Sequence, residues 1–190
     1  MSFARAGALY TGVELSRESL KLAQQRFEVF GLSGNFFEGN AEDLGAFLPP
    51  QKFDLIYSFG VIHHSPFPEK IIKSLLAYAH PETELRIMLY AKNSWKNFMI
   101  DAGLDQPEAQ SGCPIALTYD ESGVRELLTG FDVKTITQDH IFPYIIDKYV
   151  KYEYEMQPWF ASMPRGMFRA LERKLGWHLL ITATPSKAGS

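Results

Sequence analysis

Two adjacent histidines, His63 and His64, follow an apolar run and carry the side chains in this chain best suited to proton transfer. A neutral imidazole accepts a proton near physiological pH, so a histidine beside a bound hydroxyl, amine or carbon acid can act as a general base. His140 is a third imidazole, far along the chain, that could do the same. These residues are the first candidates for chemistry.

An acid and an amide end two further apolar segments. Glu14 closes the run of small and β-branched residues at 8–13, where a carboxylate can accept hydrogen bonds from both hydroxyls of a bound ribose. On position alone, Glu14 could equally be a solvated residue ahead of a helix N-terminus. Asn40 follows the segment 35–38, and its amide could pair with the edge of a base or simply form a turn.

Metal and thiol chemistry fit these residues less well. Neighbouring side chains diverge on a regular element, and no cysteine or carboxylate has ligand spacing near His63 and His64, so we expect no metal site. Cys113 is the single cysteine, which excludes an intrachain disulfide. Its position before Pro114 is more typical of a packed thiol than of a nucleophile.

Strands and helices alternate along the sequence and would position these side chains. Apolar periodicity predicts strands at 8–13, 35–38, 53–58, 85–89, 131–137 and 177–184. Helices are expected from Ser16 to Gly31, from Pro68 to the His80-Pro81 pair, after Asp120, and from Pro164 to Gly176. This order predicts an α/β fold with a mostly parallel sheet, whose ligand crevice lies at the carboxyl ends of the strands.

Composition limits the class of protein. The chain has 190 residues, 46% of them hydrophobic, which suits one domain over 1–190. A net charge of -3 and a pI near 6.0 argue against binding nucleic acid through bulk phosphate attraction. No apolar run approaches the roughly 20 residues that span a bilayer, and no signal region begins the chain. We therefore expect a cytoplasmic protein without a membrane partner.

Three motifs in register resemble the class I S-adenosylmethionine-dependent methyltransferases of the small-molecule type. They are FDLIYSFGVIHH at 53–64, preceded by YTGVELS at 10–16 and FFEGNAEDL at 36–44. Each motif alone is weak, but their order and spacing together are specific. The resemblance is detailed from Phe3 to Tyr90. It implies a Rossmann-like fold, S-adenosyl-L-methionine as cofactor, and methyl transfer to an oxygen, nitrogen or carbon of a small molecule.

The resemblance also implies roles for individual residues. The expected cofactor contacts are Glu14, Leu15, Asn40, Ala41, Glu42, Ser58 and Phe59. Among them, Glu14 would hold the ribose, the residues from Asn40 the adenine, and Ser58 with Phe59 the methionine end. The family commonly has an aspartate where Asn40 stands, but an amide oxygen can accept the same hydrogen bond. His63 and His64 would face the acceptor, with His64 as the first candidate base and His63 or His140 as alternatives.

The family's first strand and its glycine-rich GxGxG turn are missing. No two of the 14 glycines are spaced two apart. Because that strand is central in the family's sheet, we expect two unpaired inner edges, and the strands at 8–13 and 53–58 either close up directly or need an upstream segment. We interpret the chain as an amino-terminally truncated methyltransferase. The alternative is a domain whose missing strand comes from a partner chain.

Two probable substrate-side insertions interrupt the second half of the chain, at 91–119 and at 138–176. The second is rich in aromatic residues, and clustered rings suit a lid or a pocket wall for a small organic acceptor. Trp95, Tyr144 and Trp159 are the candidate substrate contacts. The same rings could instead pack a helical subdomain onto the sheet.

Two other functions stay open at this point. A methyltransferase-like domain without its cofactor turn could be a non-catalytic subunit. Tyr144 and Lys148 have the YxxxK spacing of short-chain dehydrogenases, and Glu14, which ends the second strand when the missing strand is counted as the first, also suits an NAD(P)-dependent oxidoreductase. In the same numbering Tyr144 and Lys148 follow the sixth strand, at 131–137, whereas the dehydrogenase motif follows the fifth, which favours a chance match.

Overall fold

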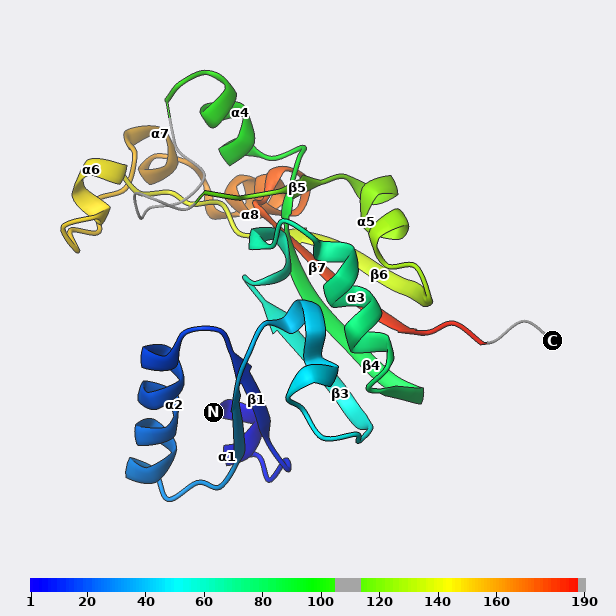
Figure 1. Cartoon of the computed structure of the whole chain (residues 1–190). Coiled ribbons are helices and arrows are strands. Elements are labelled where there is room, and N and C mark those ends of the chain that lie inside the picture. Colours follow the sequence, from blue (N-terminus) through cyan, green and yellow to red (C-terminus); the bar gives the residue numbers. More distant parts are fainter. Residues whose placement is uncertain (105–113, 188–190) are drawn as a thin grey trace.

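The computed structural model describes residues 1–104 and 114–187 of the chain, so Cys113 lies outside the described residues. Figure 1 shows two parts with a gap between their ribbons. The elements of the first part are α1 (Ser2–Arg5), β1 (Thr11–Glu14), α2 (Arg17–Val29), β2 (Asn35–Glu38) and the 3-10 helix η1 (Ala41–Ala46). The second part begins with β3 (Phe53–Phe59), η2 (Ile62–His64), α3 (Pro68–Leu76), β4 (Ala79–Ala91), α4 (Trp95–Asp101) and β5 (Thr118–Tyr119). It continues with α5 (Glu121–Leu127), β6 (Phe131–Asp139), α6 (Ile146–Tyr149), α7 (Pro158–Ala161), α8 (Arg165–Leu175) and β7 (His178–Pro185).

The first part is a parallel pair of short strands, β1 and β2, covered by α2. Ser16 caps α2 by accepting a hydrogen bond from the Ser19 amide at 3.3 Å, as the sequence predicts. The helix buries Leu20 and Phe27 against the strands, while the rest of its surface is largely exposed. This unit therefore has a thin core.

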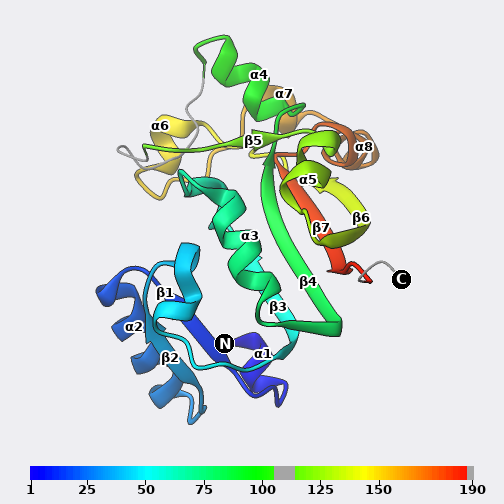
Figure 2. The same cartoon turned by 45° about the vertical axis from the view of Figure 1, so that its right-hand side comes forward.

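The second part is a sheet in the order β3-β4-β7-β6, with β5 paired to β4. β3 and β5 run parallel to β4, and β7 runs antiparallel to both β4 and β6. All strands of this sheet except β7 thus share one direction, which confirms the mostly parallel α/β fold. Helices α3 and α5 lie in front of this sheet in Figure 2. They pack on its largest buried cluster, which includes Ile72, Leu89, Val124 and Ile181.

β4 begins earlier than the sequence pattern predicts. The preceding helix ends at Leu76, before the His80-Pro81 pair that was expected to stop it, and the pair itself lies within β4. The pairing register with β3 shifts between Phe53 and Leu55, which accommodates the extra residues as an irregularity. The Thr83 hydroxyl bridges this point, because it donates to the Phe53 carbonyl at 2.5 Å and accepts from the His80 amide at 2.7 Å.

β1 and β3 are not paired with each other. Among the strands of residues 1–104 and 114–187, β1 is hydrogen-bonded to β2 alone and β3 to β4 alone, so the expected open edges are present there and β1 and β3 have not closed up directly. The two parts are joined instead by side-chain packing. Phe3 of α1 meets the Tyr57 ring edge-on at 5.2 Å, and Leu44 and Leu48 of the η1 region pack against Tyr78.

Residues 141–163, between β6 and α8, form a projection that we call the arm. It contains α6 and α7, and an isolated antiparallel bridge between Tyr144 and Met156 closes its base. In Figure 1 the arm lies at the upper left and α2 lies at the lower left, on the same side of the molecule. Among the described residues, no helix is long and apolar enough to cross a membrane.

Candidate functional site

Glu14 and Asn40 lie at neighbouring strand ends. Glu14 pairs with Glu38 at the last register position of β1 and β2, and its carbonyl accepts a hydrogen bond from the Gly39 amide at 3.0 Å. The half-buried Glu14 carboxylate is oriented by the Ser16 amide, which donates to its Oε1 at 3.1 Å. Leu15 beside it is 70% exposed, so its side chain does not enclose the site.

The turn after β2 is braced by its own side chains. Asn40 Oδ1 accepts from the Glu42 amide at 3.0 Å, so Asn40 caps η1 as well as standing at the strand end. The Ser65 hydroxyl donates to Glu42 Oε1 at 2.6 Å, and Ala41 packs beneath against the core. This ties the turn to the segment that follows β3, so the residues expected around an adenine are held in one rigid corner.

The end of β3 turns sharply at Gly60. Its φ of +74° is a conformation that favours glycine, and it lets the chain reverse from β3 into η2. Ser58 is half-buried, whereas the Phe59 ring is 48% exposed at the strand's end. Phe59 contacts the His178 ring edge-on at 5.5 Å. The expected methionine-end residues therefore line an open surface beside an imidazole of β7.

His64 is held with a defined tautomer. Its Nδ1 lies 2.7 Å from the carbonyl oxygen of Ile115, an acceptor, so Nδ1 must carry the proton and donate. In the neutral ring, Nε2 is then the nitrogen that bears the lone pair. The same segment also grips the neighbouring residue, since the Leu117 amide donates to the His63 carbonyl at 2.9 Å. His64 is thus a braced imidazole with its basic nitrogen specified.

His63 does not reach the acceptor side, which corrects the expectation that both histidines face it. Its ring is fully buried and stacks on Tyr90 at a centroid distance of 3.8 Å. Neither ring nitrogen has a hydrogen-bond partner among the described residues. Burial, and to a smaller degree the neighbouring His64 and His178, lowers the pKa of His63 to about 3. His63 is a neutral core residue and not a base.

His178 is the site residue that sequence reasoning missed. It begins β7, and its ring stacks on His140 at 4.4 Å with an interplanar angle of 16°. Burial, then His140, lowers the pKa of His178 to about 4, and burial also lowers the pKa of His140. The positions of the two histidines, each at a strand end, were visible in the sequence. Their pairing was not, because it depends on β6 and β7 running antiparallel.

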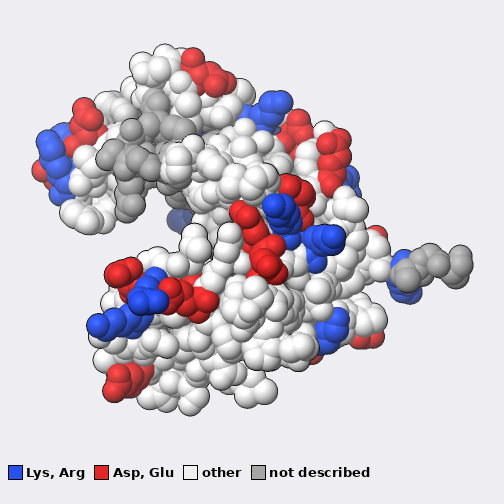
Figure 3. Space-filling view, in the orientation of Figure 1, with Lys and Arg blue, Asp and Glu red and all other residues white. Residues whose placement is uncertain are grey.

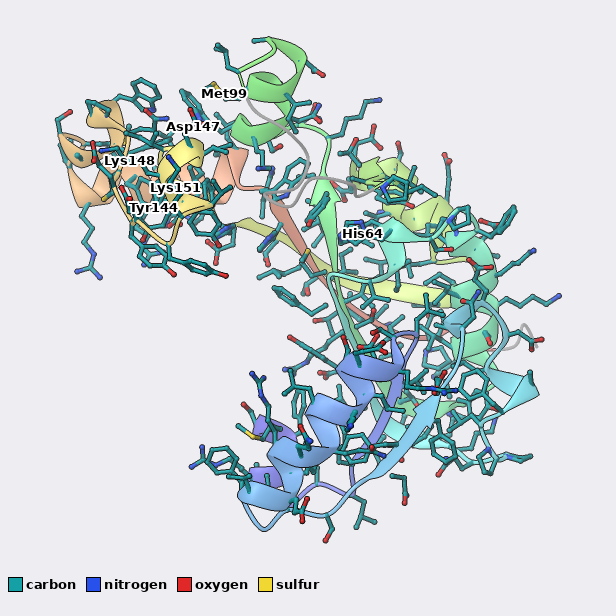
Figure 4. All side chains as sticks on the ribbon, turned by 60° about the vertical axis from the view of Figure 1, so that its left-hand side comes forward. His64, Met99, Tyr144, Asp147, Lys148 and Lys151 are labelled. Atoms are coloured by element: carbon teal, nitrogen blue, oxygen red, sulfur yellow. The ribbon has the colours of Figure 1, made fainter. Side chains whose placement is uncertain are left out.

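The three aromatic residues expected to contact substrate are distributed over two ring clusters. Trp95 of α4 meets Phe160 edge-on at 5.4 Å, and Trp159 lies 6.4 Å from the same ring, so these two tryptophans share one cluster. Tyr144 belongs to a second cluster within the arm, stacked on Tyr149 at 6.1 Å. Figure 4 shows Tyr144 and its neighbours on the arm, well apart from His64.

Lys148 is engaged away from Tyr144, which weakens the dehydrogenase interpretation. Its ammonium forms an ion pair with Glu155 across the arm, and this hydrogen bond raises the pKa of Lys148. A lysine held by a carboxylate is poorly placed to activate the tyrosine. Among the described residues, no group of three or more histidine, cysteine, aspartate or glutamate side chains could hold a metal ion.

An open hollow separates the arm from the first part of the molecule (Figure 3). Figure 3 shows it on the left of the molecule, between the arm and the first part, with charged side chains of both signs on its lower rim. A separate cavity of about 470 Å³ lies elsewhere, between α5 and the end of α8, where Tyr119, Gln138 and Arg173 contribute to its lining. None of the expected cofactor contacts lines that cavity.

Residues 1–86 match the family described as methyltransferase domain. The match contains Glu14, Asn40, the end of β3 and both histidines of η2. The amino-terminal part of the chain is therefore similar to methyltransferases. The arm and the β6–β7 pair lie beyond the matched residues.

Curated relatives are similar over part of the chain. A ubiquinone biosynthesis O-methyltransferase from Actinobacillus pleuropneumoniae is 33% identical over 84 residues, which cover 43% of this chain and 36% of the relative. The chain thus spans about a third of the length of that curated relative.

Solved structures share the fold over nearly the whole chain. The magnesium protoporphyrin IX methyltransferase from Synechocystis PCC 6803, solved with bound SAH, has a TM-score of 0.62 at 19% identity, and the match covers 97% of this chain and 68% of the other. A methyltransferase described as putative, from Bacillus halodurans C-125, has a TM-score of 0.62 at 16% identity. The match covers 93% of this chain and 83% of the other chain. These similarities establish the fold of the chain.

Proposed function

We propose that the protein transfers the methyl group of S-adenosyl-L-methionine to a small molecule. The observation that carries the proposal is that Glu14, Asn40 and the 58–64 segment each lie at or just after the carboxyl end of a strand, all inside the residues matched to the methyltransferase family. Ligands of open α/β sheets bind at this edge. A non-catalytic subunit or an NAD(P)-dependent oxidoreductase has no comparable support.

The donor groups at this edge fit an adenosyl cofactor. Glu14 is a half-buried carboxylate whose orientation is set by the Ser16 amide, which suits the two hydroxyls of a ribose. Asn40, Ala41 and Glu42 form the braced corner for the adenine, and Ser58 with Phe59 would line the methionine end. When bound, the cofactor supplies an activated methyl group on a good leaving group.

The chain's own residues then have to align the acceptor and remove one proton. His64 is the proposed general base, because the Ile115 carbonyl fixes the proton on Nδ1 and makes Nε2 the accepting nitrogen. Orientation of the acceptor against the methyl group accounts for much of the rate that such a site can supply. The arm and α4 present the aromatic rings that we propose as the acceptor wall, including Trp95, Tyr144 and Trp159.

We further propose that the acceptor is a small molecule and that the reaction takes place in the cytoplasm. The net charge of -3 disfavours nucleic acid as the substrate, and a single cysteine is common in reducing compartments. We also propose that residues 1–190 form one domain, with residues 1–90 on the cofactor side and the insertions at 91–119 and 138–176 on the acceptor side.

Calorimetry of the purified chain with S-adenosylhomocysteine tests the cofactor site. The Glu14→Gln variant should bind about 10- to 100-fold more weakly, because it loses charge-assisted hydrogen bonds to the ribose. The matched control is Glu18→Gln, an exposed acid in the first turn of α2, which should bind like the wild type. Equal affinity of Glu14→Gln and the wild type, or binding of NAD instead, would overturn the proposal.

A second measurement tests the base. The chain is incubated with methyl-labelled S-adenosyl-L-methionine and a small-molecule extract, and the labelled product is counted. His64→Gln should lower turnover about 100-fold or more while leaving cofactor affinity unchanged. Unchanged turnover would remove His64 from the mechanism without affecting the cofactor assignment.

A further inference from the structure

The base of the arm is a tight crossing of two chain segments. Residues 138–140, which lead into the arm, pass over residues 176–178, which leave α8. Gln138 Nε2 donates to the Gly176 carbonyl at 2.7 Å, and the Trp177 amide donates to the His140 carbonyl at 2.6 Å. The arm is therefore fastened to the sheet at this crossing.

Two imidazoles stack face to face at the same point. The rings of His140 and His178 lie 4.4 Å apart and nearly parallel. His178 also meets Phe59 edge-on at 5.5 Å and lies parallel to Tyr90 at 6.3 Å. The pair thus connects the entry of the arm to the floor of the candidate site.

The backbone at His140 is held in an unfavourable conformation. Its φ of +67° is in the left-handed region, which is unfavourable for a non-glycine residue. Such a conformation persists only where the surroundings enforce it. At His140 the enforcing contacts are the ring stack on His178 and the hydrogen bond from Trp177. If the stack weakened, the unfavourable backbone conformation of His140 would favour release of the arm.

We propose that the stacked His140–His178 pair is a pH-sensitive latch. It holds the arm on the sheet while both imidazoles are neutral, and it releases the arm when either ring becomes charged. The latch goes beyond methyl transfer, because it concerns the position of the arm and does not require the proposed activity.

The surroundings of the pair determine the direction of the effect. The groups that face it are Asp139 on β6, Glu172 on α8, Lys96 on α4, Tyr90 on β4 and His63 on η2. The two carboxylates favour a charged ring, and Glu172 is itself paired with Arg169 at 2.6 Å. Burial opposes them and is the largest influence on both histidines, so the pKa of His178 is lowered to about 4.

The direction of the pH effect follows from the lowered pKa of His178. A released arm would expose His178 and return its pKa toward the ordinary 6.5, so the released form binds protons more readily than the docked form. The latch is then fully effective above pH 6.5 and weakens as the pH falls toward 4. Between pH 7.5 and pH 5.0, the equilibrium for opening the arm should increase by up to about 30-fold.

Hydrogen exchange measured by mass spectrometry on the whole chain tests the latch. Amides of 144–157 report on the arm, and amides of 85–89 in β4 serve as the internal reference for global unfolding. After correction for intrinsic exchange, arm protection should fall between pH 7.5 and pH 5.0 while β4 protection is retained.

Substitutions separate the latch from other acid effects. His178→Phe keeps a ring for the stack but cannot be charged, so only His140 can still titrate and the pH response of the arm's protection should be smaller than in the wild type. His140→Asn also cannot be charged and tolerates the left-handed backbone, and it gives the same test if His178→Phe does not fold. His80→Gln is the control, because His80 lies at the far end of β4 between Asp54 and Glu82 and should respond like the wild type.

Three results would overturn the proposal. One is an arm whose protection in the wild type does not depend on pH. Another is the same pH response in His178→Phe or His140→Asn as in the wild type. The third is loss of protection in the arm and β4 together, which would mean global unfolding rather than release of a latch.

Discussion

The two parts of the molecule differ in how firmly they are built. Before β3, the buried apolar side chains of the described chain are Leu20, Phe27, Leu44 and Leu48. The sheet from β3 to β7 carries a continuous core of fully buried residues, among them Leu85, Leu89, Val124 and Leu128. Yet the first part supplies the ribose and adenine contacts that we propose. The proposed ribose and adenine contacts and the densest packing therefore lie in different places.

This difference indicates how the cofactor side is held. β1 has one strand partner and an open edge, and so does β3, so neither strand is fixed from both sides. Individual hydrogen bonds orient the cofactor residues: two local ones, from the Ser16 amide to Glu14 and from the Glu42 amide to Asn40, and one from the Ser65 hydroxyl to Glu42, 23 residues away. These hydrogen bonds thus perform the positioning that a central strand would otherwise share.

The largest expected difference between the parts is in the response to core truncation. Leu89→Ala removes a fully buried side chain from the large sheet cluster and should cost about 3–5 kcal/mol of unfolding free energy. Leu44→Ala, in the three-residue cluster beside η1, should cost about 2 kcal/mol, because a thin cluster can collapse onto the space. Urea denaturation of both variants measures the contrast. A cost for Leu44→Ala equal to that of Leu89→Ala would contradict it.

Much of the fold follows from sequence pattern because it is local. The caps at Ser16 and Asp120 and the start of a helix at Pro68 are short-range features, and they occur where the pattern predicts them. The mostly parallel sheet follows from the alternation of strands and helices. The early start of β4 does not, because the irregularity at Thr83 depends on a hydrogen bond to Phe53, 30 residues away.

The site was predictable only in part, for the same reason. Positions at strand ends could be assigned from their motifs, but burial could not. His63 and His64 are equivalent in the sequence, yet one stacks under Tyr90 and the other is anchored by Ile115. The role of His178 depends on the antiparallel pairing of β6 and β7, which brings Asp139 opposite it. Long-range register is therefore the information that the pattern lacks.

The second contrast between the parts is in acid sensitivity, which should arise from the sheet. His63 is buried and neutral, and its pKa is lowered to about 3, so the unfolded chain binds a proton more readily. The contribution of neutral His63 to the free energy of unfolding is complete above pH 6.5 and is lost as the pH falls toward 3. Between pH 7.5 and pH 4.5 this loss should be about 2–3 kcal/mol.

Urea denaturation across that pH range provides the measurement. His63→Phe removes the titrating group while retaining a ring against Tyr90, so its profile should be flatter than that of the wild type. His80→Gln leaves the buried site intact and should follow the wild-type profile. An unchanged slope in His63→Phe would show that the acid sensitivity arises elsewhere in the molecule.

The smallest expected contrast concerns two glycines with close neighbours. A Cβ at Gly176 would lie 2.2 Å from the Asp139 carbonyl oxygen, which is backbone at the fastened base of the arm. A Cβ at Gly12 in β1 would meet the Tyr10 ring at 2.9 Å, a side chain on the less densely packed part that can move aside. Gly176→Ala should therefore lower the free energy of unfolding by about 1–3 kcal/mol, and Gly12→Ala by less than 1 kcal/mol.

A Cβ at Gly166 in α8 would have nothing within 4 Å, so Gly166→Ala should stabilise the protein by about 0.5–1 kcal/mol through helix propensity. Thermal unfolding ranks the three variants. If Gly12→Ala proved as costly as Gly176→Ala, the first part would have to be as rigid as the sheet, and the contrast between the two would not hold.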